Sequence, residues 1–452
     1  MSPTLQQNAT QVVRRLQEAG HTAYFAGGCV RDQLLGVEAK DYDIATSATP
    51  DQVQETLPRV TDLQGKSFGV VRALEGEHVF EVATFRRESG YSDGRRPDAV
   101  EFTNAEEDAQ RRDFTVNGLF FDPVADKLID FVGGQKDLLE ATVRAIGEPR
   151  ERFAEDKLRL LRAVRFTANL HLGRSKFELA PETWSALQQM APEICTVSIE
   201  RIRDELDKIW TGPAPGRGLD LLDTSGLLAQ PCVLPEIAVM HGVEQPPEFH
   251  PEGDVYEHVQ LMMSQLKNAP LVLALGVLFH DVAKPTTQTF DAGSNRIRFN
   301  GHETVGADMT EQIMRRLRYP NDLIADVCTL VRYHMQFKDV LRMKISTLKR
   351  MLARPTVDEE LELHRIDCLC SHGDVENYHF LINKREELEE DEIQPAKLIN
   401  GHDVMQMGIP PGRQVGKILD KIYEAQLEGL IETHEEAKRM ARSLASGLDE
   451  DD

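Results

Sequence analysis

The sequence predicts an α+β protein, in which strands and helices come first and helices alone follow. Two runs rich in β-branched residues, 68–72 (FGVVR) and 78–84 (HVFEVAT), are typical of strands and lie near the N-terminus. From Glu151 onward, apolar residues recur at the spacing of helices. The chain is therefore expected to have four parts: a head over 1–145, a helical neck over 146–215, a helical body over 216–395 and a helical tail over 396–452.

Length and composition favour a cytoplasmic protein of several domains. A chain of 452 residues suggests about two to four domains, and 41% apolar with 6% aromatic residues is expected of a soluble, helix-rich protein. The chain contains no run of about eighteen apolar residues, and its first residues lack the apolar centre of a signal peptide. We therefore expect no membrane association.

The net charge of −23 argues against a protein that coats nucleic acid through bulk charge. A local basic strip is nevertheless present, because residues 157–177 contain six basic residues and no acidic one. Such a strip can hold a phosphate backbone. The cysteines are scattered without a CxxC pair, and we expect all of them to be reduced thiols. They are Cys29, Cys195, Cys232, Cys328, Cys368 and Cys370.

One stretch, residues 26–46 (AGGCVRDQLLGVEAKDYDIAT), carries the residues from which a catalytic site is predicted. The glycines at 27–28 permit a turn whose backbone N–H groups can close on a phosphate, and the guanidinium of Arg31 suits phosphate oxygens. Asp41 and Asp43 are two residues apart, so on a strand both side chains point to the same face. Paired carboxylates of this kind hold two divalent cations in phosphoryl or nucleotidyl transfer. A solvated Asp-x-Asp loop is the alternative, and the neighbouring glycines and arginine argue against it.

Local patterns assign other segments of the head. Residues 5–18 and 50–57 are expected to be helices. Glu81 lies on the predicted strand 78–84, where it could supply a third carboxylate to the metal site or be an ordinary exposed acid. Residues 91–102 contain Asp-Gly and a proline, and we expect a mobile lid loop over a site.

A second basic element follows that loop. Arg111 and Arg112 are adjacent, and Asn117 comes shortly after them. Guanidinium and amide groups of this kind could meet a triphosphate and a ribose.

Three motifs, GGCVRDQLLG…DYD, RRDFTVNGLFFD and RFAEDKLRLLRAVRF, together resemble the class II tRNA nucleotidyltransferases and their relatives, the bacterial poly(A) polymerases. Both belong to the polymerase-beta-like nucleotidyltransferase superfamily. The resemblance covers about the first 210 residues. It implies a head with a mixed β-sheet flanked by helices, holding two Mg²⁺ on Asp41 and Asp43. It also implies that Gly28, Arg31 and Arg112 contact the incoming nucleotide.

The neck combines an apolar stripe with a polar face. At about 100° per residue, one helix face carries the stripe and the opposite side carries Asp156, Arg159 and Arg162. Arg165 comes round to the edge of the stripe, where we expect it to brace the site rather than read a base. The residues of the stripe are Leu158, Leu161, Val164 and Ala168.

The polar face of the neck suits base recognition. Cytosine and adenine each present an amino donor beside a ring acceptor, which complements the acceptor Asp156 and the donor Arg159. Uracil and guanine present the reverse order and would leave both protein groups unpaired. A solvated arginine face is the alternative. In the family, the matching Glu-Asp-x-x-Arg motif implies a protein template for CTP and ATP.

The resemblance limits which nucleotides the protein is expected to add, but it leaves more than one possibility open. Poly(A) polymerases typically carry a basic G-R-R-F-like element, whereas residues 65–69 here read GKSFG. This difference favours a tRNA nucleotidyltransferase. Enzymes that add only CC tend to lack the lid loop, and DGRRPD is present at 93–98, so addition of a terminal A is expected. Addition of all of CCA and addition of A alone both remain open.

A second group of residues in the body resembles the HD phosphohydrolase superfamily, an all-helical fold with a mononuclear or dinuclear metal centre. Neutral imidazoles and carboxylates suit a transition metal. Lys284, shortly after the His-Asp pair, also fits the pattern. Hydrolysis at this site and a relic site in a body that grips tRNA both remain open. The predicted ligands are His258, His280, Asp281, His302, His334 and Asp367.

Two helical segments complete the prediction. Residues 198–210 are expected to form a helix with Ser198 as its cap, and residues 417–444 another helix before an acidic tail. Residues 398–419 resemble the C-terminal part of nucleotidyltransferases that carry an HD region.

The sequence thus predicts a template-independent nucleotidyltransferase that adds CMP, AMP or both to tRNA 3′ ends, with CTP, ATP and tRNA as partners. The alternatives are a poly(A) polymerase and an HD-type phosphohydrolase with a nucleotide-sensing head. No oligomeric state is predicted.

Overall fold

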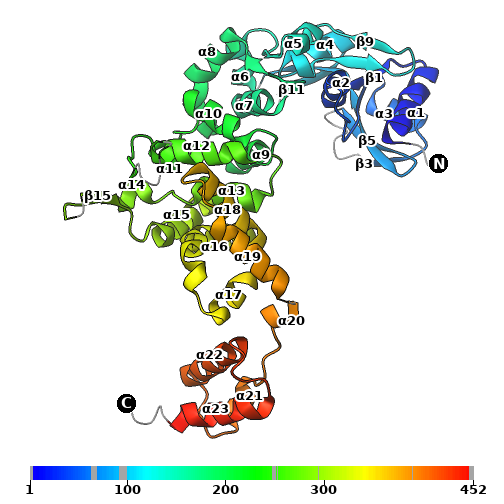
Figure 1. Cartoon of the computed structure of the whole chain (residues 1–452). Helices are drawn as coiled ribbons and strands as arrows, with labels where there is room; N and C mark the ends of the chain where they lie inside the picture. Colours follow the sequence, from blue (N-terminus) through cyan, green and yellow to red (C-terminus); the bar gives the residue numbers. More distant parts are fainter. Residues whose placement is uncertain are drawn as a thin grey trace. The chain divides into compact units, whose positions relative to one another are not determined.

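The computed structural model describes residues 4–446 except 63–68, 91–98, 247–250, 252, 294 and 389. The predicted lid motif at 93–98 and most of the run at 65–69 therefore lie outside the described residues. The chain forms two compact units, whose elements are labelled in Figure 1. The first unit comprises Met1–Val239, Met263–Leu271 and Ile313–Tyr319, and the second comprises Met240–Met262, Val272–Gln312 and Pro320–Asp452.

The head is built on a seven-stranded mixed sheet in the order β3-β4-β5-β2-β1-β8-β9. Only β2 and β5 run parallel, while the other neighbours are antiparallel. This arrangement confirms the predicted α+β class. The strands are β1 (Ala23–Ala26), β2 (Asp43–Thr46), β3 (Val60–Asp62), β4 (Val70–Glu75), β5 (His78–Thr84), β8 (Phe120–Asp122) and β9 (Lys127–Ile129).

The two predicted head helices are confirmed as α1 (Leu5–Glu18) and α3 (Pro50–Thr56). Each begins at a threonine, Thr4 or Thr49, whose side chain forms a capping box with the glutamine three residues on. Such a box satisfies backbone donors that a helix start otherwise leaves unpaired. Both helices contact strands of the sheet with their apolar sides.

The segment 91–102 was expected to be a loop, and this is wrong for its last part. Residues Ala99–Phe102 form β7, which pairs antiparallel with β6 (Arg86–Ser89). Val100 and Phe102 are residue types that favour a pleated strand, and the neighbouring strand supplies the hydrogen-bonding partners that a local pattern cannot show.

The neck was expected to be one helix from Glu151, but it is two: α6 (Pro149–Glu155) and α7 (Arg159–Asn169). Asp156 adopts an extended backbone, and its carboxylate accepts a hydrogen bond from the Leu158 N–H at 3.1 Å. An aspartate that bonds its own backbone in this way competes with helix formation. The predicted apolar stripe is confirmed, since Leu158, Leu161, Val164 and Ala168 are all buried.

The rest of the first unit is mainly helical. Ser198 precedes α9 as predicted, although its side chain makes no capping hydrogen bond in the described structure. The remaining principal elements are α2 (Gly28–Leu34), α4 (Ala105–Gln110), η2 (Thr115–Asn117), α5 (Gly134–Leu139), α8 (Pro181–Met190), η3 (Ala191–Thr196), α9 (Ile199–Trp210), α10 (Pro215–Thr224) and α11 (Pro235–Ala238).

The expectation of reduced cysteines is wrong for one pair. Cys195 and Cys232 form a disulfide, with their Cα atoms 5.4 Å apart. The two residues are 37 positions apart, so only the tertiary fold brings them together. The other four cysteines lie outside any disulfide, as predicted.

The second unit consists largely of helices. The segment 417–444, expected to be one helix, is divided by a turn at Gly429, whose φ of 73° suits glycine. Its main helices are α12 (Val255–Gln265), α13 (Leu271–Phe279), α15 (His302–Arg316), α16 (Asn321–Tyr333), η4 (His334–Arg342), α17 (Ile345–Leu352), α18 (Val357–Cys370), α19 (Glu376–Glu387), α21 (Gly401–Met405), α22 (Arg413–Leu427) and α23 (His434–Ser446). Short elements add α14 (Lys284–Thr287), α20 (Glu390–Ile393) and the hairpin β14 (Thr289–Asp291) to β15 (Arg296–Arg298). Among the described residues, none of the helices combines the length and apolar character that crossing a membrane requires.

Close packing of the head predicts a difference between two glycine substitutions. A Cβ on Gly134, the first residue of α5, would lie 2.1 Å from the Thr115 carbonyl oxygen, whereas one on Gly416 in α22 would meet no atom within 4 Å. We expect Gly134→Ala to cost about 1–3 kcal/mol of unfolding free energy through overpacking. Gly416→Ala is the matched control and should gain about 0.5–1 kcal/mol, because alanine is the better helix former. Thermal unfolding monitored by circular dichroism measures both, and equal midpoints for Gly134→Ala and the parent chain would contradict the packing argument.

Candidate active site and metal centre

A cavity of about 640 Å³ in the first unit collects the residues that the sequence singles out in the head and the neck. Its lining comes from the turn before α2, the start of β2, the end of α4, the α6–α7 junction and α9. Every predicted site residue of the head and neck lines it except Glu81. These are Gly28, Arg31, Asp41, Asp43, Arg112, Asp156, Arg159, Arg162 and Arg165.

The glycine turn allows a close approach between two segments of the head. Gly27 has a φ of 73°, and a Cβ there would lie 3.0 Å from Nη1 of Arg112. A side chain at this position would therefore strain the backbone and displace the guanidinium. The turn from β1 into α2 thus leaves Arg112 beside Gly27, and both residues line the cavity.

The two aspartates line this cavity at the N-terminal end of β2, the central strand of the sheet. Asp43 is the first residue of β2, while Asp41 lies just before the strand rather than on it. Burial raises the pKa of Asp43 to about 6, and the charges of Asp41 and Glu81 add to this shift, whereas Arg112 opposes it. Carboxylates that repel one another in a partly buried site fit a divalent cation, which relieves that repulsion.

Glu81 lies on β5, the strand parallel to β2. Its carboxylate forms an ion pair with Arg72 of β4 at 3.1 Å, and both side chains are about half exposed. Glu81 does not line the cavity, although its charge acts on Asp43. Its role as a third ligand stays a prediction.

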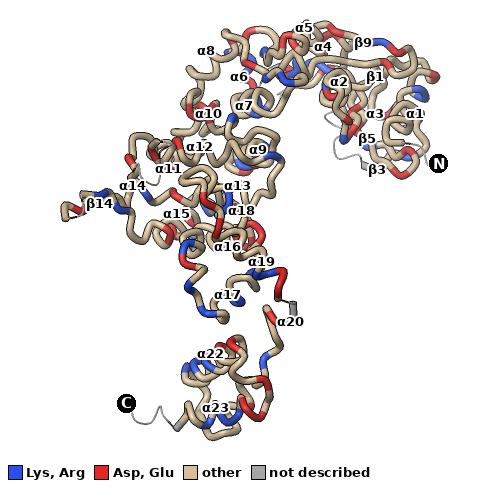
Figure 2. The backbone as a smooth tube through the Cα atoms, in the orientation of Figure 1, with Lys and Arg blue, Asp and Glu red and all other residues tan. Residues whose placement is uncertain are grey.

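Seven arginines line the cavity, and acidic groups orient them. The basic and acidic positions along α2, α7 and α9 are marked in Figure 2. The buried Asp108 pairs with both Arg111 and Arg112, at 2.8 and 3.0 Å. Asn117 accepts a hydrogen bond from Arg31 at 2.6 Å. These contacts hold the guanidinium groups in place without neutralising all of their charge, which suits a polyanionic ligand.

Two further carboxylates hold the arginines of α7. Asp113 pairs with Arg162 at 2.6 Å, and Glu205 of α9 pairs with Arg165 at 2.6 Å. Burial alone would raise the pKa of Asp113, but Arg162 and the hydrogen bond from Asn117 hold this pKa well below its ordinary value. Burial alone would also raise the pKa of Glu205, but Arg165 and the other cations around it lower this pKa below its ordinary value. Both acids are therefore ionised at neutral pH, and they hold the side chains of Arg162 and Arg165 in place.

Phe166 is the centre of a cluster of cations. The guanidinium carbons of Arg31, Arg162 and Arg165 lie 5.3, 5.2 and 4.2 Å from the centre of its ring. Cations over an aromatic face are attracted by its quadrupole. Arg165, which packs closest to the ring and also pairs with Glu205, has the contacts expected of a bracing residue.

The predicted base-reading residues share the cavity, but their side chains have different partners. Arg159 donates to Glu155, whereas Asp156 pairs with Arg201 of α9 at 2.6 Å. Sequence reasoning missed Arg201, Glu205 and Phe166. The helix 198–210 was predicted, yet its periodicity does not show which of its charged residues face another segment.

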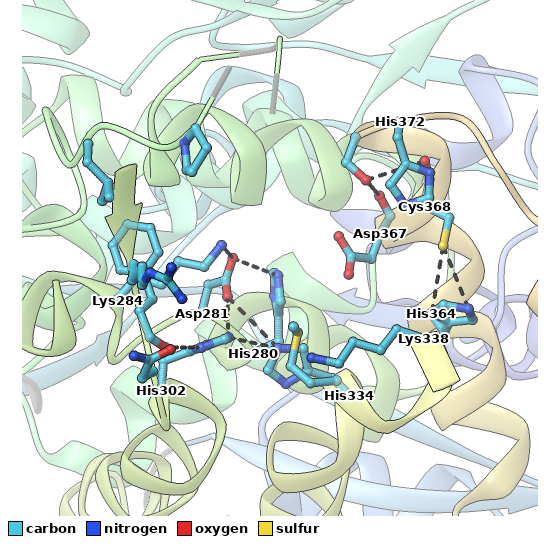
Figure 3. Close-up of a pocket in the computed structure, with 17 residues that line it drawn as sticks. His280, Asp281, Lys284, His302, His334, Lys338, His364, Asp367, Cys368 and His372 are labelled. Carbon is cyan, nitrogen blue, oxygen red and sulfur yellow. Dashed lines mark hydrogen bonds and ion pairs between the residues drawn. The ribbon is translucent and has the colours of Figure 1, made fainter. Parts of the chain in front are cut away.

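The second unit holds a separate cluster of histidines and aspartates, shown in Figure 3. Its ligand atoms form two groups, His258, His280 and Asp367 in one and Asp281, His302 and His334 in the other. Within each group the ligand atoms lie within 4.8 Å of one another. All six residues are those predicted from the sequence, and they come from α12, the end of α13, α15, η4 and α18.

Backbone carbonyls fix the orientation of three imidazoles. The Nδ1 atoms of His280, His302 and His334 lie 2.7–2.8 Å from carbonyl oxygens three residues earlier in the chain. A carbonyl only accepts, so each Nδ1 carries the proton and each Nε2 is directed into the cluster. The Nε2 atoms of His302 and His334 lie 3.2 Å apart. Such outer hydrogen bonds are typical of histidines that ligate metals.

The charges of the cluster also fit a metal. Burial lowers the pKa of His334 to about 3, and His280 and His302 reinforce the effect, so this imidazole is neutral. Burial alone would raise the pKa of Asp281, but His280 and Lys284 hold it well below its ordinary value. Neutral imidazoles and ionised carboxylates are the protonation states that bind a transition metal. The cluster opens into a cavity of about 560 Å³ that Lys284 and Lys338 also line.

Comparison with known proteins places three family matches along the chain. Residues 23–144 match the family described as "Poly A polymerase head domain", residues 176–240 "Probable RNA and SrmB- binding site of polymerase A", and residues 254–370 "HD domain". The CCA-adding enzyme of Lactobacillus helveticus is 32% identical over 434 residues, which cover 95% of this chain and 94% of that enzyme. This chain belongs to the family of CCA-adding enzymes.

Other CCA-adding enzymes agree with this assignment. The enzyme of Geobacillus stearothermophilus is 41% identical over 230 residues, which are 51% of this chain and 55% of that protein. The crystal structure of the Bacillus stearothermophilus CCA-adding enzyme in complex with CTP matches over 100% of both chains, with a TM-score of 0.74 and 26% identity. The Thermotoga maritima CCA-adding enzyme complexed with tRNA shares the fold, with a TM-score of 0.59 and 20% identity over 99% of this chain and 96% of that one.

The raised pKa of Asp43 predicts a pH-dependent affinity of the head for Mg²⁺. A proton and a cation compete for this carboxylate, so the affinity should be constant above about pH 6 and fall about tenfold for each pH unit below it. Isothermal titration of Mg²⁺ in the presence of a non-hydrolysable CTP analogue measures the effect.

Two variants control this experiment. Asp43→Asn should lose most of the affinity and its pH dependence together, whereas Asp220→Asn, an exposed acid on α10, should behave as the parent chain. An affinity of the parent chain that stays flat from about pH 7 to 5 would contradict the assignment of Asp43 as a ligand.

Proposed function

We propose that this chain builds the CCA end of tRNA by adding CMP and AMP from CTP and ATP without a nucleic-acid template. The observation that carries the proposal is the single cavity in which Asp41 and Asp43 share walls with Asp156 and Arg159. Reacting groups and base-reading groups within one cavity of about 640 Å³ fit a site for one nucleoside triphosphate. Related structures of CCA-adding enzymes contain bound CTP, ATP or tRNA, which supports the same activity.

The chemistry is attack of the terminal ribose hydroxyl of tRNA on the α-phosphate of the nucleotide, with pyrophosphate leaving in line. Arg31, Arg111 and Arg112 bind and orient the triphosphate through guanidinium donors. Asp41 and Asp43 would hold two Mg²⁺, which supply charge neutralisation and a lower pKa for the attacking hydroxyl when bound. Arg165 and Phe166 brace the neighbouring arginines. The site of action is the cytoplasm, where tRNA and both nucleotides are available.

Asp156 and Arg159 select the base of the incoming nucleotide. Their acceptor and donor groups complement the amino group and ring nitrogen of cytosine and adenine, and leave uracil and guanine with unpaired groups. The acceptor arm of tRNA is held mainly through its backbone and shape, as is usual for RNA helices.

The experiment that tests this function uses three tRNA substrates, ending without CCA, in C and in CC, each incubated with one labelled nucleotide and Mg²⁺. We expect CMP on the first two, AMP only after CC, and at least about hundredfold less UMP or GMP, because mismatched hydrogen bonds are costly in a closed site. Asp41→Ala and Asp43→Ala should abolish addition. Addition of A alone would restrict the function to terminal A addition, and long A tails on unstructured RNA would instead indicate a poly(A) polymerase.

We infer a second activity for the body, the metal-dependent hydrolysis of a phosphate ester. Two groups of metal ligands open into one cavity, and Lys284 lies 2.7 Å from Asp281 at its wall. Lys338 lines the same cavity and adds positive charge for an anionic substrate. A transition metal on the imidazoles would supply Lewis acidity.

This second activity predicts a coupled loss of metal and hydrolysis. His280→Ala and Asp281→Ala should lower the Mn²⁺ or Co²⁺ retained per chain, measured by mass spectrometry, and the hydrolysis of bis(p-nitrophenyl) phosphate, while tRNA addition continues. His379→Ala, an exposed histidine of α19, is the control and should retain both properties. Full metal binding without hydrolysis in the parent chain would leave the site a structural one.

A further inference from the structure

Arg201 is a residue of the nucleotide cavity that the predicted motifs do not include. It lies in the first turn of α9, and its guanidinium reaches Asp156 across 45 positions of sequence. The side chains of Arg201 and Asp156 are 22% and 17% exposed, so their ion pair is largely shielded from solvent. Both residues line the cavity.

The guanidinium of Arg201 and the carboxylate of Asp156 form two side-by-side hydrogen bonds, an arrangement called a fork. Nη1 of Arg201 donates to Oδ1 of Asp156 at 3.2 Å, and Nη2 donates to Oδ2 at 2.6 Å. The Leu158 N–H also donates to Oδ1, at 3.1 Å. Such a fork fixes the plane of a carboxylate as well as its position.

These contacts determine how many further hydrogen bonds the carboxylate of Asp156 can accept. An ionised carboxylate accepts at about four lone-pair positions, two on each oxygen. Among the described residues, Oδ1 accepts from two donors and Oδ2 from one. The remaining position therefore belongs to Oδ2, and it is available to a donor in the cavity.

We propose that Arg201 is a positioning residue for base selection, which holds Oδ2 of Asp156 where the exocyclic amino group of cytosine or adenine donates to it. This inference rests on the proposed function. Uracil and guanine present an oxygen at the same place, and an acceptor held against an acceptor gains nothing. Loss of the fork should therefore weaken the use of CTP and ATP and leave the poor use of UTP and GTP almost unchanged.

A purely structural role for Arg201 makes a different prediction. If the ion pair served only to attach α9 to the α6–α7 junction, its loss would lower addition of all four nucleotides alike. Arg203 on the same helix offers a matched control. It pairs with Asp204 at 2.8 Å, donates to the Arg318 carbonyl at 2.6 Å and does not line the cavity.

The test compares Arg201→Met, Arg201→Lys and Arg203→Met with the parent chain. Steady-state kinetics with tRNA ending in C and in CC give kcat and KM for each nucleotide separately. We expect Arg201→Met to lower the preference for CTP over UTP, and for ATP over GTP, by about tenfold or more, mainly through a higher KM for the correct nucleotide. Arg201→Lys keeps the charge but not the fork, and it should have intermediate selectivity. Arg203→Met should keep the preference of the parent chain.

The outcomes separate the two proposals. A parent chain that adds no nucleotide to tRNA overturns the proposed function and this inference with it. A parent chain that adds CMP and AMP, with Arg201 variants whose preference is unchanged or whose activity falls equally for all nucleotides, overturns the positioning role alone. If Arg201→Met does not fold, the selectivity of Arg201→Lys decides, because it preserves the cation that lies against Asp156.

Discussion

The cavity of the head and neck depends on ion pairs between arginines and acids that come from distant parts of the chain. Seven guanidinium groups in one cavity would repel one another and lose their orientation without partners. Asp108, Asp113 and Glu205 are buried and hold four of these seven arginines by direct contacts, namely Arg111, Arg112, Arg162 and Arg165. A triphosphate can then meet a fixed array of donors rather than mobile side chains. Such preorganisation is what makes buried charge useful for phosphate chemistry.

The candidate metal sites of the head and of the body each bring chemically similar side chains close together. In the head, burial and the charges of Asp41 and Glu81 raise the pKa of Asp43, which favours a cation that binds oxygen ligands. In the body, backbone carbonyls direct imidazole nitrogens toward one another, and Asp281 and Asp367 supply the negative charge. Hard carboxylate oxygens in one site and imidazole nitrogens in the other suit different metals. One chain can therefore bind two kinds of metal ion, each at its own set of ligands.

The break between α6 and α7 shows how a local departure from helical structure serves a site. In a continuous helix, the Asp156 backbone would join the helical hydrogen bonds. The direction of its carboxylate would then be set by its position relative to the apolar stripe. The hydrogen bond from the Leu158 N–H instead fixes an extended residue at the junction. Arg201 then reaches this carboxylate from α9. The apolar stripe begins after the break, and its residues Leu158 and Leu161 are buried.

The sequence by itself identified the candidate site residues, because turn glycines, paired aspartates and helical spacing are local patterns with direct physical meaning. It also predicted the α+β class, the helices 5–18 and 50–57, the strand 78–84 and the six residues of the HD cluster. Tertiary structure decided the partners: Asp156 with Arg201, Arg165 with Glu205, and Cys195 with Cys232. These pairs join segments about 40 residues apart. Their formation depends on how helices pack, and no local pattern specifies which charged or sulfur-bearing side chains of two helices will meet.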